Sequence, residues 1–179
     1  MSQYVALLRG INVGANKRIG MADLRLALTA AGFEDVRTLL QSGNVVLTGS
    51  GSESSIGGQV EKVIAEEFGF DVGVVVRSAK QVAAVCKADP LGDIASDESK
   101  YMVVFCSTKP KAAAVRSLGE MDFGEERMAV KGKDIYAWCP GGTQNSKLFK
   151  AIENEKVAPL ITVRNWRTVG KLLELTRSG

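Results

Sequence analysis

A buried strand followed by a cationic loop is predicted by the segment Val5-Ala6-Leu7-Leu8-Arg9-Gly10-Ile11-Asn12-Val13-Gly14-Ala15-Asn16-Lys17. Its four leading apolar residues predict a buried strand, and the glycines, amides and cations that follow predict a loop. Apolar residues then recur at helical spacing over 21–31. Two short strands, 36–40 and 44–48, flank the turn Gln41-Ser42-Gly43-Asn44 and predict a hairpin.

A helix over 56–68, a strand over 72–76 and a short helix over 79–87 complete the order βαββαβ plus one helix. The same order returns roughly ninety residues later, a period that indicates a duplicated domain and not a solenoid. Its elements are a strand 101–106, a helix 110–118, a hairpin within 127–139, a helix 146–155, a strand 160–163 and a helix 165–175. The βαββαβ order is typical of ferredoxin-like domains. We therefore predict an α+β protein of two ferredoxin-like halves, 1–88 and 98–179, joined by a linker 89–97. Each half has a mainly antiparallel sheet with helices on one face.

Composition excludes several classes of function. The 179 residues carry a net charge of +3, which is too weak to indicate bulk nucleic-acid binding. There is no histidine, so the usual zinc sites and histidine-based triads are excluded, and we predict neither metal nor cofactor. Three cysteines without a CxxC pair indicate reduced thiols. No targeting segment or membrane-length apolar run stands out, so we expect a cytoplasmic protein without membrane contact.

The loop after the first strand and the hairpin turn are the first two candidate binding segments. Arg9, Asn12 and Lys17 combine a guanidinium fork, an amide and an amine with glycines that allow close backbone approach. They fit an anionic ligand, and they fit equally a loop shaped for packing. Ser42 and Asn44 could face a ligand, although bonding of the turn's own backbone is the favoured interpretation.

The segment Gly141-Gly142-Thr143-Gln144-Asn145-Ser146-Lys147 is the third candidate, a glycine-rich loop between a strand and a helix. Free N–H groups and the helix dipole favour phosphate at such a place. Ser146 and Lys147 are the candidate ligands, with Ser146 also the expected helix cap. The segment is not a Walker A motif, because Ser146 and Leu148 stand where that motif has Gly and Ser/Thr.

The closing motif Thr162-Val163-Arg164-Asn165-Trp166-Arg167-Thr168 is the fourth candidate. Asn165 is placed to cap the last helix, which leaves Arg164 and Arg167 near its N-terminus. Cations are electrostatically disfavoured there, so their presence indicates an anion or an acidic partner that offsets the repulsion.

Alternating aromatic residues raise a different possibility. Tyr101 and Phe105 share one face of a strand, and Tyr136 and Trp138 share one face of another. RNA-recognition domains stack bases on aromatic residues of their central strands. The segment 133–138 does not match the pattern of those domains, and packing of the aromatics within the protein is the favoured interpretation.

Three motifs together resemble one bacterial family, the domain of unknown function 1697. They are Leu8 to Gly14 with Lys17 and Met21, the turn 41–44, and the closing motif 162–168. The family usually has Gly-Gly after Asn-Val, and here the second glycine is Ala15. The resemblance spans nearly the whole chain and implies two ferredoxin-like halves. It implies no activity.

We therefore expect a binding protein for a small anionic ligand, a nucleotide or a phosphorylated metabolite, in a cationic cleft between the halves. Its predicted ligand-binding residues are Arg9, Asn12, Lys17, Ser42, Asn44, Ser146, Lys147, Arg164, Asn165 and Arg167. One alternative is an RNA-binding protein that uses the aromatic face. Another is a phosphoryl-handling or transferase enzyme without histidine, and the sequence assigns it no catalytic residue. Oligomeric state stays open.

Overall fold

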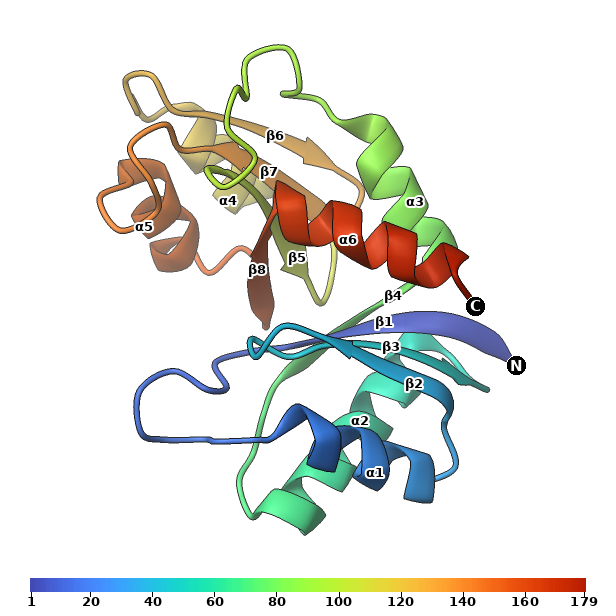
Figure 1. The fold of residues 1–179 in the computed structure, drawn as a ribbon. Coiled ribbons are helices and arrows are strands. Elements are labelled where there is room, and N and C mark those ends of the chain that lie inside the picture. Colours follow the sequence, from blue (N-terminus) through green and yellow to red (C-terminus); the bar gives the residue numbers. More distant parts are fainter. The chain divides into compact units, whose positions relative to one another are not determined.

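The computed structural model describes residues 1–179 and divides them into two compact units. The first unit is Met1–Ala84 with Lys171–Gly179, and the second is Val85–Gly170. Each unit contains one four-stranded antiparallel sheet (Figure 1). The strand orders are β2-β3-β1-β4 and β6-β7-β5-β8, so the second sheet repeats the topology of the first. The predicted α+β class with two βαββαβ halves is confirmed.

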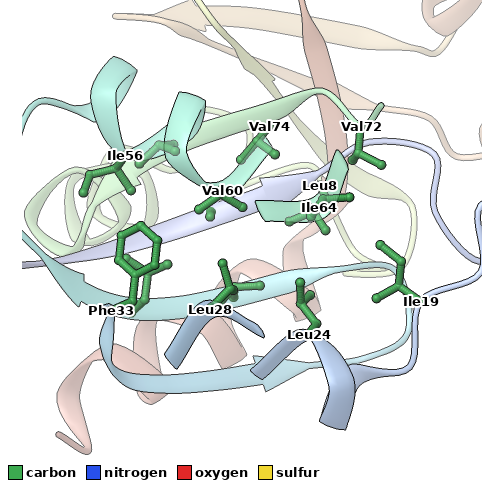
Figure 2. Close-up of a cluster of buried hydrophobic side chains, with 14 of the residues drawn as sticks. Leu8, Ile19, Leu24, Leu28, Phe33, Ile56, Val60, Ile64, Val72 and Val74 are labelled. Carbon is green, nitrogen blue, oxygen red and sulfur yellow. The ribbon is translucent and has the colours of Figure 1, made fainter. Parts of the chain in front are cut away.

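The first sheet is built from β1 (Ser2–Leu8), β2 (Glu34–Leu39), β3 (Asn44–Gly49) and β4 (Val74–Ser78). Helices α1 (Met21–Ala30) and α2 (Glu53–Phe68) cover one of its faces. Their apolar sides pack on alternate strand residues, because strand side chains point to opposite faces in turn. Figure 2 shows Leu24 and Leu28 of α1 and Ile64 of α2 within this core, and all three are fully buried.

The helix ends follow local chemistry. Ser52 caps α2 by accepting a hydrogen bond from the Ser55 N–H at 3.1 Å. Gly69 ends the same helix with φ 79°, a left-handed conformation that glycine adopts without a Cβ clash. Helix α3 (Ala79–Ala88) follows β4 directly, and Ser78 accepts a hydrogen bond from the Gln81 N–H at 3.2 Å.

The second sheet is built from β5 (Tyr101–Cys106), β6 (Arg127–Lys131), β7 (Asp134–Trp138) and β8 (Ile161–Asn165). Helices α4 (Ala112–Gly119) and α5 (Lys147–Asn154) cover one face, where Leu118 and Leu148 are buried against strand residues. Helix α6 (Trp166–Arg177) follows β8 without a loop. The predicted strand 101–106 has the observed bounds, and the other predicted bounds differ from the observed ones by a few residues.

Candidate functional site

The β1–α1 loop (residues 9–20) leaves the first sheet between the two strands that neighbour β1. The Leu8 N–H donates to the Gly43 carbonyl at 2.9 Å, and the Arg9 N–H donates to the Gly73 carbonyl at 2.9 Å. These bonds tie the start of the loop to the β2–β3 turn on one side and to the segment before β4 on the other. The far end is anchored by Ile19, which is 2% exposed and packs into the core of this half (Figure 2).

Asn12 holds the loop in shape. Its Nδ2 donates to the carbonyls of Ile19 at 3.0 Å and Gln41 at 2.7 Å, and its Oδ1 accepts from the Ile19 N–H at 2.9 Å. An amide nitrogen has two protons, so both donors of Asn12 are used inside the protein. Asn12 also has φ 55°, a conformation that asparagine tolerates better than most residues. The predicted ligand-binding residue is thus in position to orient the loop.

Three cations project from the same loop. Arg9, Lys17 and Arg18 are all exposed. The Lys17 Nζ donates to the Asp71 carbonyl at 2.9 Å, and neither Arg9 nor Arg18 has a side-chain hydrogen bond or an ion pair. Arg18 was missed by the sequence analysis, although its position directly after Lys17 was a usable signal.

The backbone of this loop alternates between positive and negative φ angles. Gly10, Asn12 and Gly14 have φ of 68°, 55° and 65°, while Ile11 and Val13 between them have negative φ. In other proteins, alternation between left-handed and right-handed residues turns successive N–H groups toward one side, which is the arrangement of anion-binding nests. The N–H groups of Gly10, Ile11, Val13 and Gly14 donate no hydrogen bond within the protein.

The β2–β3 turn is shaped by its own bonds. The Asn44 Nδ2 donates to the Leu39 carbonyl at 2.8 Å and to the Ser42 Oγ at 3.0 Å, and Asn44 is fully buried. Gly43 has φ 85°, and a Cβ there would lie 2.7 Å from Ile11 Cδ1 and 2.8 Å from Leu8 Cβ. The turn role predicted for Asn44 is confirmed. Ser42 is exposed and lies in the turn whose Gln41 carbonyl bonds Asn12, at the same end of the sheet as the loop.

Ser146 and Lys147 lie at the N-terminus of α5, and an internal carboxylate already occupies that place. The Glu126 Oε1 accepts hydrogen bonds from the Lys147 N–H at 3.0 Å and the Leu148 N–H at 3.2 Å. The Ser146 Oγ donates to the Glu126 Oε2 and accepts from the Phe149 N–H at 2.9 Å. The predicted cap role of Ser146 is confirmed. Glu126, which the sequence analysis missed, takes the position that we expected a phosphate to occupy.

Cys139 lies beside this cluster. Its Sγ is 3.4 Å from the Ser146 Oγ, and its side chain is fully buried. Burial disfavours the thiolate and raises the pKa of Cys139 to about 11, so the group is a protonated thiol at neutral pH. The arrangement indicates a structural junction between α5 and β7 and not a reactive cysteine.

Arg164, Asn165 and Arg167 have three different surroundings. Arg164 is 9% exposed on β8, and its Nη1 donates to the Thr162 Oγ1 and the Val163 carbonyl, both at 2.8 Å. Loss of hydration lowers the pKa of its guanidinium to about 10. The Asn165 Oδ1 accepts from the Thr168 N–H at 2.9 Å, which confirms its predicted role as the cap of α6.

Arg167 is the exposed cation of this motif, on the first turn of α6. The positive charge of Arg167 acts on the carboxylate of Asp97. The pKa of Asp97 is lowered chiefly by hydrogen bonds from Ser99 and, to a smaller degree, by Lys100 and Arg167. An acidic neighbour therefore offsets part of the repulsion that the helix dipole imposes on Arg167.

A buried arginine occupies the same place in both halves. Arg77 on β4 is opposite Val5 of β1, and Arg164 on β8 is opposite Val103 of β5. Like Arg164, Arg77 donates from Nη1 to the carbonyl of the preceding residue, at 3.0 Å. In both cases the next residue caps the following helix, so the strand–arginine–cap–helix unit is repeated. The sequence analysis missed Arg77.

The aromatic side chains do not form an open binding face. Tyr101, Phe105, Tyr136 and Trp138 are all at most 8% exposed. The ring of Trp166 stacks on Tyr101 at a centroid distance of 4.6 Å, and the Tyr136 hydroxyl donates to the Val85 carbonyl at 3.1 Å. Burial raises the pKa of both tyrosines. The RNA-binding alternative required these four rings to be exposed, and the structure contradicts that requirement.

No cluster of three or more cysteine, aspartate or glutamate side chains is arranged to hold a metal ion. No helix has the length and apolar character needed to span a bilayer. Two further points stay predictions. One is the division of the chain into 1–88, 89–97 and 98–179, and the other is that residues of both halves share one cleft.

The class of protein is defined by the duplicated antiparallel sheets with helices on one face and by the constrained cationic loop of the first half. The family model described as "Protein of unknown function (DUF1697)" matches residues 1–136. The chain belongs to this family, as the resemblance predicted; the matched residues contain the first two motifs and end before the closing motif 162–168.

Among solved structures, the chain is similar to the conserved bacterial protein SP0830 from Streptococcus pneumoniae. The two chains share 22% sequence identity, and the TM-score is 0.78 over 97% of this chain and 98% of that one. At this identity the similarity supports the fold alone. The comparison with curated proteins gives no match.

Proposed function

We propose that this protein binds a small anionic ligand, such as a nucleotide or a phosphorylated metabolite, at the β1–α1 loop of its first half. One observation carries the proposal. Four backbone N–H groups without acceptors lie in a loop that also presents Arg9 and Arg18, neither of which has an acidic partner. Free amides and unneutralised guanidinium groups are what a phosphate group needs as ligands.

The strain in the loop favours binding over simple packing. Lys17 has φ 50°, and a lysine in the left-handed region costs about 1 kcal/mol. Its side chain then reaches the Asp71 carbonyl, which fixes the loop against the segment before β4. Asn12 fixes the loop against the β2–β3 turn in the same way. A loop held from two sides keeps its N–H groups oriented before a ligand arrives, which lowers the entropic cost of binding.

The side chains divide into two roles under this proposal. Arg9, Arg18 and the exposed Ser42 contact the ligand, with Lys17 adding positive charge. Asn12 and Asn44 position the loop and the turn, because their amide donors are already used internally. Ser146 and Lys147 are not part of the proposed site, because Glu126 binds the N–H groups around them. Arg164 and Arg167 belong to the second unit, and their part in ligand binding stays a prediction separate from this site.

A thermal-shift screen with inorganic phosphate, pyrophosphate and common nucleotides tests the proposal. A ligand that binds the native state stabilises it by an amount that grows with the logarithm of the ligand concentration divided by the dissociation constant, and so raises the melting temperature. The shift should be lost in Arg9→Ala and Arg18→Ala. It should persist in Arg116→Ala, because Arg116 is an exposed arginine of α4 in the second half. If no anion raises the melting temperature, or all three variants respond alike, the loop is not the site.

The enzyme alternative has a separate test. A phosphoryl-handling enzyme would turn over a stabilising ligand, and incubation followed by phosphate release would reveal it. Release that disappears in Lys17→Ala but survives in Arg116→Ala would favour an enzyme over a binding protein.

A further inference from the structure

A groove on the first half is lined by none of the residues of the proposed anion site. It has a volume of about 460 Å³ and lies between helices α1 and α2. Asp23, Leu26, Ala27 and Ala30 of α1 line it, together with Glu67 and Phe68 of α2. Ligand pockets in proteins commonly have volumes of about 300–1,000 Å³, so the groove is large enough for a small organic molecule.

The lining combines an apolar surface with two carboxylates. Leu26 is 70% exposed, although leucine is usually buried, and Phe68 adds an aromatic surface beside it. The side chains of Asp23 and Glu67 have no hydrogen bond or ion pair in the structure. The neighbouring Glu66, in contrast, pairs with Lys62 at 3.7 Å and does not line the groove. Arg25 of α1 donates to the Thr38 hydroxyl and does not neutralise either carboxylate.

We propose that this groove binds a small organic cation, an ammonium compound with an apolar or aromatic body. The apolar body would cover Leu26, Ala30 and Phe68, and this contact would remove apolar surface from water. The ammonium group would pair with Asp23 or Glu67, and the aromatic ring of Phe68 adds a further attraction for a cation. Charge complementarity selects this class, because the two carboxylates attract a cation, offer a neutral ligand of the same shape no ion pair, and repel an anion.

A titration with 2-phenylethylammonium, followed by amide shifts in two-dimensional ¹⁵N NMR spectra, tests the inference. We expect shifts concentrated on α1 and the end of α2, with a dissociation constant of about 10 mM or below for a ligand of this size. The neutral isostere 2-phenylethanol should bind at least about fivefold more weakly. Asp23→Asn and Glu67→Gln should each weaken ammonium binding about two- to fivefold, because each removes one exposed charge partner.

Glu66→Gln is the matched control, since it removes the same charge one residue away and leaves the groove intact. Its affinity for 2-phenylethylammonium should equal that of the unaltered protein. Both conservative substitutions are at exposed positions, and the same spectra report whether the variants are folded. Equal binding of the alcohol, equal effects of Glu66→Gln and Glu67→Gln, shifts outside α1 and α2, or the absence of any shift would each overturn the inference. None of these outcomes affects the anion site, which is tested with different ligands and variants.

Discussion

Replacement of Glu126 by alanine should destabilise the second half of the protein. The Glu126 carboxylate accepts three hydrogen bonds at the start of α5, from the Ser146 hydroxyl and from the N–H groups of Lys147 and Leu148. Helix α5 has only eight residues, so its N-terminal bonds are a large fraction of its stabilising contacts. Without them a short helix is marginal in water.

The expected loss is about 2–3 kcal/mol of unfolding free energy. Loss of the hydrogen bond from the Leu148 N–H costs about 1 kcal/mol, and loss of a negative charge at a helix N-terminus costs about 0.3–1 kcal/mol. Ser146 is 3% exposed, so loss of the carboxylate acceptor of its hydroxyl adds about 1 kcal/mol. Water can replace the carboxylate at the exposed Lys147, which therefore adds little.

Urea denaturation followed by tryptophan fluorescence measures this loss. The chain has two tryptophans, Trp138 and Trp166, and both belong to the second unit. Glu125→Ala is the matched control, because Glu125 is exposed and has no partner; its change should stay within about 0.5 kcal/mol. Inorganic phosphate should stabilise Glu126→Ala more than the unaltered protein, since it can occupy the vacated place. Equal stabilities of the two variants would refute the assignment of Glu126 as the internal anion of α5.

Further predictions concern the loop, the turn and the cysteines. Asn12→Ala should cost about 2 kcal/mol of unfolding free energy and should also abolish any anion-induced thermal shift, because three hydrogen bonds that orient the loop are lost; retention of the shift would separate loop order from binding. Gly43→Ala should reduce stability by at least about 2 kcal/mol, since a Cβ there has neither room nor an allowed backbone conformation, and a melting curve would show it. With a thiol reagent at neutral pH, the half-buried Cys86 should be modified first and Cys139 only on unfolding, as mass spectrometry can determine. Raising the pH from 8 to 10 should lower stability by about 1 kcal/mol through Cys139 alone: the unfolded thiol ionises near pH 9 and the folded one near pH 11, so the folded state keeps a proton that the unfolded state releases. A urea midpoint that is higher at pH 10 than at pH 8 would contradict this expectation.

The sequence predicted features that depend on contacts between near neighbours in the chain. Strand and helix order, the turn at Gly43, and the caps at Ser146 and Asn165 were all predicted, because each follows from the spacing of apolar residues or from a side chain that bonds its own backbone within a few residues. The duplication was visible for the same reason, since two halves with the same order of elements form the same sheet.

The sequence could not assign roles to the polar residues of the candidate site. Asn12 and Lys17 looked alike as possible ligands. In the structure the Asn12 amide uses both of its donors inside the protein, whereas the exposed Lys17 amine makes one hydrogen bond, to the Asp71 carbonyl. The anionic partner of α5 was not predictable, because Glu126 lies about twenty residues before the N–H groups that it binds. The burial of Arg164 was likewise hidden, since a strand pattern does not say which face is covered.

By itself, the amino-acid sequence determined the α+β class, the repeated βαββαβ order and the cationic character of the first loop, because periodicity, turn residues and charge are local properties. Only the tertiary structure decided which polar groups are satisfied internally and which stay available. That distinction depends on which segments, distant in sequence, approach within hydrogen-bonding distance, and it removed Ser146 and Lys147 from the proposed site while leaving Arg9 and Arg18 without partners.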